Sequence, residues 1–285
     1  MIRYAKPTTV AEALSLLGED NWRILAGGTD FYPAQGTKPL RENILDINGL
    51  AELRGILETS SHWTIGARTS WAEIERHPLP GCFDALRQAA REVGSRQIQN
   101  VATVAGNLCN ASPAADGVPA LLILDAEVEM RSAKATRYLS LSAFILGNRR
   151  TALQPDEMVC AIRIPKSVAV GISAFHKLGA RRYLVISIAM AAVRLIIEDG
   201  IVADAAIAVG ACSAVAKRLA GVEAALRGCK TGRSIEAAIM QAPIEELAPI
   251  GDVRGTANYR LDAAREIVAR AALAIVDTAD KKAAA

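Results

Sequence analysis

The first half of the chain alternates short apolar runs with glycine-containing turns. Short apolar runs bounded by turn residues are typical of strands, whereas apolar residues spaced three and four apart indicate helices. The first pattern predicts strands at Trp22–Ala26, Ile44–Ile47, Trp63–Ala67, Glu127–Met130 and Met158–Ile164. The second predicts helices at Ser70–Arg76, Phe83–Val93 and Asp116–Leu124, the first and last opened by their own N-cap residues. The stretch Pro165–Gly171 follows neither pattern, so we expect it to link two units.

The second half has longer apolar runs, and helical periodicity follows them. The runs predict strands at Ser173–Leu178, Ile186–Ile197 and Ile201–Ala211. Asp199-Gly200 between the last two is a hairpin signal. Helices are predicted at Ala214–Leu226, Ser234–Gln241 and Leu261–Thr278. Strands followed by helices indicate an α+β domain in which helices cover one face of an antiparallel sheet.

Composition and charge narrow the class of protein. The chain has 285 residues, with 33 Lys and Arg against 30 Asp and Glu, so its formal net charge is only +3. No basic arm stands out, which argues against nucleic-acid binding. The mean hydropathy of +0.21 is high, yet the apolar stretches fall short of the ~20 residues that a membrane-spanning helix needs. We therefore expect no membrane span, and we attribute part of the apolar surplus to contacts with other subunits.

The cysteine pattern and the N-terminal residues bear on the location of the protein in the cell. The five cysteines are scattered and form no C-x-x-C pair. This disfavours a disulfide framework, a structural zinc site and an iron–sulfur cluster held by this chain. Residues Met1–Val10 have no apolar region of the kind found in secretory signals. Reduced cysteines and the absence of a leader predict a cytoplasmic location.

No self-contained catalytic site is evident. The three histidines (His62, His77 and His176) lie far apart in sequence, and no H-E-x-x-H, P-loop or G-x-G-x-x-G motif is present. A self-contained hydrolase or a Rossmann dehydrogenase therefore has little support.

Two glycine-containing segments are the candidate binding residues. The first, Leu25–Asp30, reads L-A-G-G-T-D. A strand that ends in Gly-Gly can bend with a positive φ and turn backbone N–H groups toward an anion, although an ordinary turn explains the segment equally well. The second, Thr103–Asn107, reads T-V-A-G-N and continues as a polar, uncharged loop to Asp116. We expect no cation beside either segment, so N–H dipoles would hold a pyrophosphate between them.

Three motifs, in order and suitably separated, carry a family resemblance. A-G-G-T-[DN] stands at Ala26–Asp30, T-[IV]-G-G-N-L-x-x-A-S-P-x-x-D at Thr103–Asp116, and D-x-R-[GA]-[ST]-x-x-Y-R at Asp252–Arg260. Over nearly its whole length the chain resembles the FAD-binding medium subunit of the molybdenum hydroxylases, the xanthine dehydrogenase and carbon monoxide dehydrogenase group. The resemblance implies an α+β protein with a two-part FAD-binding domain of the vanillyl-alcohol-oxidase (PCMH) type at residues 1–168. A smaller α+β C-terminal domain, an antiparallel sheet with helices, would occupy residues 172–285.

The resemblance also assigns roles to residues. The first pyrophosphate loop would comprise Leu25, Ala26, Gly27, Gly28, Thr29 and Asp30, and the second Thr103, Val104, Ala105, Gly106 and Asn107. Asp116 would accept hydrogen bonds from the adenosine ribose, and Val159 would lie near the adenine or flavin ring. Lys177, or His176 beside it, would face the isoalloxazine and stabilise the reduced, anionic flavin.

Some positions depart from the family pattern. Ala105 replaces a glycine, which is tolerable only at negative φ. Gln99 replaces a common Arg and removes a charged contact at the flavin or at a subunit interface. The cysteine-rich insertion that holds a [4Fe–4S] cluster in some relatives is missing, so we expect no such cluster. Neither loop contains a histidine, and Cys109 is interpreted as a small packing residue, so we expect FAD to be bound non-covalently.

The function implied is that of an oxidoreductase subunit in a multi-subunit molybdenum hydroxylase. Electrons would pass from [2Fe–2S] clusters in a small partner subunit through FAD in this chain to an external acceptor. Molybdopterin would belong to a large partner subunit, and the assembly would be a dimer of heterotrimers. Two alternatives remain open: a stand-alone FAD-dependent oxidoreductase, and a structural subunit with a decayed flavin site, which Ala105 and Gln99 would support.

Overall fold

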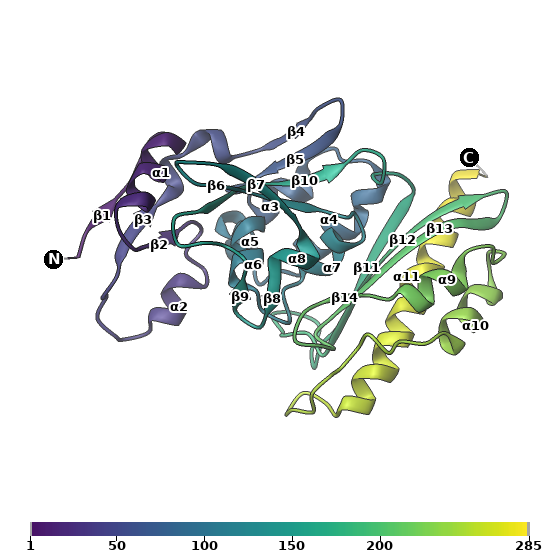
Figure 1. Ribbon diagram of the computed structural model, residues 1–285. Helices are drawn as coiled ribbons and strands as arrows, with labels where there is room; N and C mark the ends of the chain where they lie inside the picture. Colours follow the sequence, from purple (N-terminus) through teal and green to yellow (C-terminus); the bar gives the residue numbers. More distant parts are fainter. Residues whose placement is uncertain (1, 284–285) are drawn as a thin grey trace.

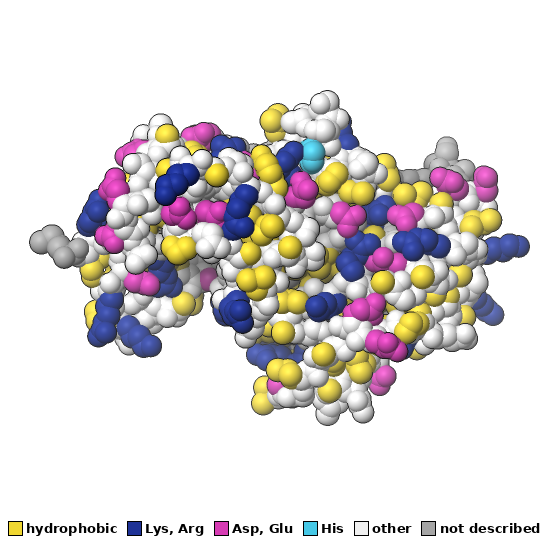
Figure 2. Space-filling model, in the orientation of Figure 1, with side chains coloured by type: hydrophobic (Ala, Val, Ile, Leu, Met, Phe, Trp, Pro, Cys, Tyr) yellow, Lys and Arg dark blue, Asp and Glu magenta, His cyan; other side chains and the backbone are white. Residues whose placement is uncertain are grey.

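The computed structural model describes residues 2–283, which form three consecutive parts (Figure 1). We call them the N-terminal lobe (residues 2–53), the middle lobe (54–165) and the C-terminal domain (172–283). Figure 2 shows Lys and Arg side chains interspersed with Asp and Glu over the face drawn, without a continuous basic surface. Within residues 2–283, no helix combines the length and the apolar character needed to cross a bilayer.

The N-terminal lobe is a small parallel sheet with its own core. Its three strands have the order β1-β3-β2, and both pairings are parallel. Helix α1 packs its apolar face on the sheet, and the Thr9 side chain caps its first turn. The elements are β1 (Tyr4–Ala5), α1 (Val10–Glu19), β2 (Trp22–Leu25), α2 (Phe31–Gln35), β3 (Asn43–Asp46) and the 3₁₀ turns η1 (Ile47–Gly49) and η2 (Ala51–Leu53).

The middle lobe is a five-stranded antiparallel sheet with helices against it. Its strand order is β4-β5-β10-β6-β7, so the apolar strand β10 lies at the centre. Ser70 forms a capping box with Glu73 at the start of α3, as its sequence predicts. The strands of this sheet are β4 (Ile56–Glu58), β5 (His62–Gly66), β6 (Glu127–Arg131), β7 (Thr136–Ser140) and β10 (Met158–Pro165), while β8 (Ile145–Gly147) and β9 (Arg150–Thr151) form a separate two-stranded sheet. The helices are α3 (Trp71–Arg76), η3 (Gly81–Phe83), α4 (Asp84–Glu92), α5 (Arg96–Val101), α6 (Val104–Asn110), α7 (Gly117–Leu122) and α8 (Leu141–Phe144).

The C-terminal domain is a four-stranded antiparallel sheet with three helices. The predicted hairpin is confirmed: β12 and β13 pair across Asp199 and Gly200, which have φ values of 50° and 73°. The elements are β11 (Ile172–Leu178), β12 (Ala189–Glu198), β13 (Ile201–Gly210), β14 (Lys217–Arg218), α9 (Ala220–Leu226), α10 (Arg233–Gln241) and α11 (Ala257–Ala283).

The C-terminal sheet is covered on both faces, whereas the sequence pattern predicted cover on one. Alternate residues of β12 join different cores: Ala191 and Val193 pack with α9–α11, while Met190 and Ala192 pack with the middle lobe. The second cover comes from α4 and α7, which lie between the two sheets (Figure 1). Burial on both sides explains why β12 is a continuous apolar run rather than an alternating one.

Three local predictions were wrong. The segment after Thr103 is not a loop, because the Thr103 hydroxyl accepts a hydrogen bond from the N–H of Gly106 at 3.0 Å and starts α6. Helix α9 starts only at Ala220, because Lys217 and Arg218 pair with β13 as an edge strand. Asp116 precedes α7 but does not cap it, since its carboxylate binds a lysine of the C-terminal sheet.

Arg260 ties the loops of the C-terminal domain together. Its side chain is buried, and it donates to the carbonyl oxygens of Ile188 at 2.6 Å and Ala211 at 2.9 Å and to Asp252 Oδ1 at 2.7 Å. Hydrogen bonds from the Arg254 backbone and from Arg260 lower the pKa of Asp252 to about 2. This accounts structurally for the spacing of Asp252 and Arg260 in the third motif.

We expect Arg260→Met to lower the free energy of unfolding by about 2–4 kcal/mol, because buried carbonyls would lose a charged donor. Urea-induced unfolding measures the change. Arg270→Met is the matched control, since Arg270 is exposed and its ion pair is with Glu266 one turn away on the same helix, so its loss should cost less than about 0.5 kcal/mol. Equal losses in the two variants would contradict the role of Arg260.

Candidate functional site

A cavity of about 660 Å³ lies between the N-terminal lobe and the middle lobe. Most of its lining comes from three segments far apart in sequence: residues 22–34 around β2 and α2, residues 102–110 around α6, and residues 153–159 at the start of β10. This volume lies within the range of small-molecule and cofactor sites. The site is therefore a cleft between two lobes, each of which has its own core.

The first glycine segment forms the edge of the N-terminal lobe that faces the middle lobe. A side chain on Gly27 would place its Cβ 2.0 Å from the carbonyl oxygen of Val101, so only glycine allows the two backbones to approach. Gly28 has a φ of 75°, which turns the chain away from β2. Ala26, Gly27, Gly28, Thr29 and Asp30 all line the cavity, whereas Leu25 is buried behind it.

The backbone of this segment presents unused donors. Among residues 2–283, the N–H groups of Gly27, Gly28, Thr29 and Asp30 have no hydrogen-bond acceptor. Successive free N–H groups in a turn form a concave site for an anion such as a phosphate. The arrangement therefore fits a ligand that brings acceptor oxygens to this wall.

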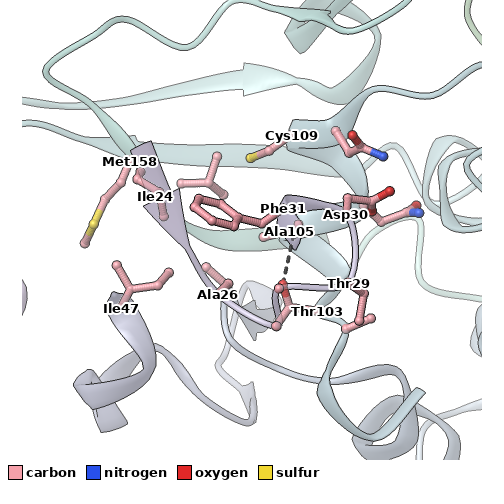
Figure 3. A pocket seen from close by; sticks show the side chains of 18 of the residues that line it. Ile24, Ala26, Thr29, Asp30, Phe31, Ile47, Thr103, Ala105, Cys109 and Met158 are labelled. Atoms are coloured by element: carbon pink, nitrogen blue, oxygen red, sulfur yellow. Dashed lines mark hydrogen bonds between the residues drawn. The ribbon is translucent and has the colours of Figure 1, made fainter. Parts of the chain in front are cut away.

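The second glycine segment, at the start of α6, forms the wall that adjoins the first segment. Thr103, Ala105, Gly106 and Asn107 line the cavity, and Val104 points into the core of the middle lobe. The side-chain oxygen Oδ1 of Asn107 is buried, and it has no hydrogen-bond donor among the described residues. A buried acceptor without a partner is costly, so this amide also fits a bound ligand that supplies a donor. Figure 3 shows Thr103 and Thr29 on the same side of the cavity.

The other end of the cavity is apolar. Ile24, Ile47 and Met158 lie together there, away from Thr29 and Thr103 (Figure 3). Trp22 and Val159 also line the cavity. Flat apolar walls suit an aromatic base, and free N–H groups at the opposite end suit phosphates. Apart from Val159, sequence reasoning missed these residues, because they come from different elements and share no motif.

One cation lies in the wall, contrary to the expectation that none would be near. The guanidinium of Arg23 lies 4.2 Å from the centre of the Phe31 ring, and both residues line the cavity. The signal was present in the sequence, since Arg23 occupies β2 just before the first glycine segment.

Cys109 is a wall residue rather than an activated thiol. Its exposed surface faces the cavity, while the surrounding protein raises the pKa of the thiol to about 12. A thiol of such high pKa stays neutral and unreactive at physiological pH.

Asp116 and Lys177 lie apart from the cavity and pair with each other. The Nζ atom of Lys177 lies 2.9 Å from Asp116 Oδ2, and Ser187 donates to the other carboxylate oxygen at 3.2 Å. Burial raises the pKa of Asp116 to about 6, although the Lys177 ammonium lowers it. Neither residue lines the cavity, so the structure differs from the expected contacts with ribose and isoalloxazine. His176, the alternative to Lys177, does not line it either, and burial lowers its pKa.

The two departures from the family motif are accommodated by the fold. Ala105 lies within α6 at a negative φ, as the expectation required. Gln99 is buried, and its side-chain amide donates to the carbonyl oxygen of Arg91 at 2.9 Å. Gln99 therefore secures the turn between α4 and α5 and does not reach the cavity, which corrects its interpretation as a lost contact to the flavin or to a subunit interface.

The family profile described as "FAD binding domain in molybdopterin dehydrogenase" matches residues 1–167. The profile "CO dehydrogenase flavoprotein C-terminal domain" matches residues 173–275. The chain belongs to this family of FAD subunits. The family resemblance, the α+β fold class, the oxidoreductase assignment and FAD as cofactor are thereby confirmed.

Individual relatives agree with the profiles. The nicotinate dehydrogenase FAD-subunit of Eubacterium barkeri is 37% identical over 216 residues, which cover 72% of each chain. The carbon monoxide dehydrogenase medium chain of Hydrogenophaga pseudoflava is 28% identical and covers 94% of each chain. A solved structure of carbon monoxide dehydrogenase from H. pseudoflava superposes with a TM-score of 0.84 at 30% identity, covering 95% of each chain. A Cu,Mo-CO dehydrogenase structure gives a TM-score of 0.88 at 26% identity, covering 96% of this chain and 98% of that one.

We expect Gly27→Ala to weaken FAD binding at least tenfold, because the added methyl group would push the two walls apart. Titration with FAD, followed by flavin fluorescence, measures the affinity. Gly18→Ala is the control: its Cβ meets nothing within 4 Å, and alanine suits the α1 interior better than glycine. Similar affinities for the two variants would contradict the close-approach argument.

For the ion pair, we expect Asp116→Asn and Lys177→Met each to cost roughly 3 kcal/mol of unfolding free energy, since each leaves a buried partner unpaired. The double variant should lose clearly less unfolding free energy than the two single variants together, and the difference, the coupling energy between the two residues, should be at least about 1 kcal/mol. Unfolding by urea measures all three, and additive losses would contradict the pairing. Loss of FAD binding in the double variant, with folding intact, would favour direct contact with the cofactor instead.

Proposed function

We propose that this chain is the FAD-carrying electron-transfer subunit of a multi-subunit molybdenum hydroxylase. The observation that carries the proposal is that the cavity wall contains a row of backbone N–H groups without an acceptor at residues 27–30 and the unpaired amide oxygen of Asn107. These donors and this acceptor match a pyrophosphate flanked by hydroxyl groups, and the apolar end matches adenine. Bound there non-covalently, FAD would supply the redox chemistry, relaying electrons from [2Fe–2S] clusters of a small partner subunit to an external acceptor.

The chain's own residues bind and orient the cofactor. Gly27 and Gly28 bring the backbone donors of the N-terminal lobe to the pyrophosphate, and Thr103 holds the first turn of α6 in place by capping it. Asn107 would accept a hydrogen bond from a hydroxyl group of the cofactor. The apolar end around Ile24, Ile47 and Met158 would exclude water from the adenine.

We assign Asp116 and Lys177 a positioning role in FAD binding. If Gly117, next to Asp116, carried a Cβ atom, it would lie 3.2 Å from Asn107 Oδ1. The ion pair with Lys177 therefore holds the start of α7 against the wall that contains Asn107. The ribose and flavin contacts inferred from the family resemblance would require this pair to rearrange.

The catalytic centre belongs to partner subunits in this proposal. Relatives are named as medium or FAD subunits, which supports a large molybdopterin-binding partner and a small [2Fe–2S] partner, arranged as a dimer of heterotrimers. A cytoplasmic location agrees with five cysteines that are all free among the described residues.

The decisive experiment joins binding with electron transfer. The purified chain, reconstituted with FAD, is mixed with its small [2Fe–2S] partner, which has been reduced beforehand and freed of reductant. We expect the flavin absorption to bleach in the presence of the reduced partner and to persist with the oxidised one. Turnover of a substrate by the isolated chain would favour a stand-alone oxidoreductase, and no flavin binding would favour a structural subunit.

Asn107→Leu should reduce FAD affinity about fivefold, the equivalent of one hydrogen bond near 1 kcal/mol. Equilibrium dialysis against FAD measures it. Asn100→Leu is the control, because Asn100 is exposed and lies outside the cavity. An unchanged affinity in Asn107→Leu would remove Asn107 from the binding site.

A further inference from the structure

Helix α2 covers part of the cavity without being part of either core. None of its five residues is buried, yet Phe31 and Ala34 line the cavity. Figure 3 shows the Phe31 ring between Ile24 and Ala105, and Figure 1 shows α2 and the loop after it projecting from the lobe below β2. A helix with so little buried apolar area is held only by specific contacts.

The polar contacts of this segment go to one residue. Backbone hydrogen bonds from residues 31–42 stay within residues 28–38. Among the described residues, every polar side-chain contact from this segment to the rest of the protein is made with Arg23: a hydrogen bond to Gln35 Oε1 at 3.2 Å and an ion pair with Glu42 at 3.5 Å. The same guanidinium stacks on Phe31 at 4.2 Å. Arg23 is itself fixed, because it lies on β2 in the parallel sheet.

The segment has a flexible residue at each end of the helix. Gly28 has a φ of 75° before α2, and Gly36 has a φ of 56° after it, with open space around its Cβ position. Backbone rotation at glycine meets little steric resistance, so these positions can absorb a change in the helix direction.

We propose that residues 31–42 form a lid over the FAD cavity and that Arg23 is the positioning residue that latches the lid shut. Arg23 holds the lid at three points: the Phe31 ring, the Gln35 amide and the Glu42 carboxylate. Opening the latch exposes the cavity between Ile24 and Ala105 and lets FAD enter or leave. The inference rests on FAD being the ligand, as proposed above.

The latch is tested first without FAD. In the full chain, Arg23→Met should raise amide hydrogen exchange at residues 31–40 at least tenfold, while exchange in β2 and β3 stays as in the wild type. Arg3→Met is the matched control, because Arg3 also stacks on a ring of this lobe, Trp22 at 4.8 Å, and pairs with Glu19, but does not touch residues 31–42. Exchange at residues 31–40 that is equal in Arg23→Met and the wild type would overturn the latch, whatever the chain binds.

The second measurement is the rate at which FAD leaves the loaded chain after dilution, followed by flavin fluorescence. We expect release about tenfold faster in Arg23→Met, release within twofold of the wild type in Arg3→Met, and partial rescue in Arg23→Lys. FAD should also slow exchange at residues 31–40 of the wild-type chain. Equal release rates in Arg23→Met and the wild type would overturn the lid, while FAD binding and the electron-transfer proposal would stand. A wild-type chain that takes up no FAD would instead overturn both.

Discussion

The cofactor site depends on how closely the backbone of Gly27 approaches the carbonyl oxygen of Val101. The N-terminal and middle lobes have separate cores, and the cavity exists because their edges meet here without side chains between them. The segment that makes this approach also carries the backbone N–H groups of residues 27–30, which have no acceptor among the described residues. The approach of Gly27 to Val101 thus shapes the cavity, and the same segment supplies N–H groups that are free to bind a ligand.

The rest of the protein holds this junction in place. The C-terminal sheet packs α4 and α7 between itself and the middle lobe, and the buried pair of Lys177 and Asp116 crosses that interface. Arg260 fixes the loops on the far side of the same sheet. The small residues of β12 let helices close on both faces, which accounts for the high hydropathy of a chain with few aromatic residues. The apolar residues behind this high hydropathy therefore lie in a core of three layers: α4 and α7, the C-terminal sheet, and α9–α11.

Among the described residues that line the cavity there is no histidine, and the carboxylate of Glu157 is paired with Arg137. The thiol in the cavity wall is neutral, and the cation in this wall stacks on an aromatic ring. Such a site suits a subunit that positions a redox cofactor, because the chemistry then belongs to the cofactor and the protein supplies orientation and environment. Membership of the FAD-subunit family agrees with this description.

The sequence by itself determined the local features. The Ser70 cap, the Asp199-Gly200 hairpin and the periodicity of α11 follow from short-range rules and are present, and the glycine segments marked two walls of the cavity. Tertiary structure decided which distant residues meet. Ile24, Ile47 and Met158 share no motif, and they meet only because the lobes close on one another. Asp116 and Lys177 looked like separate ligands but pair together, since a buried charge takes the nearest counter-charge that packing provides. Patterns along the chain encode the conformation of neighbours, whereas partners 60 or more residues apart, such as this pair, are fixed by the packing of whole layers.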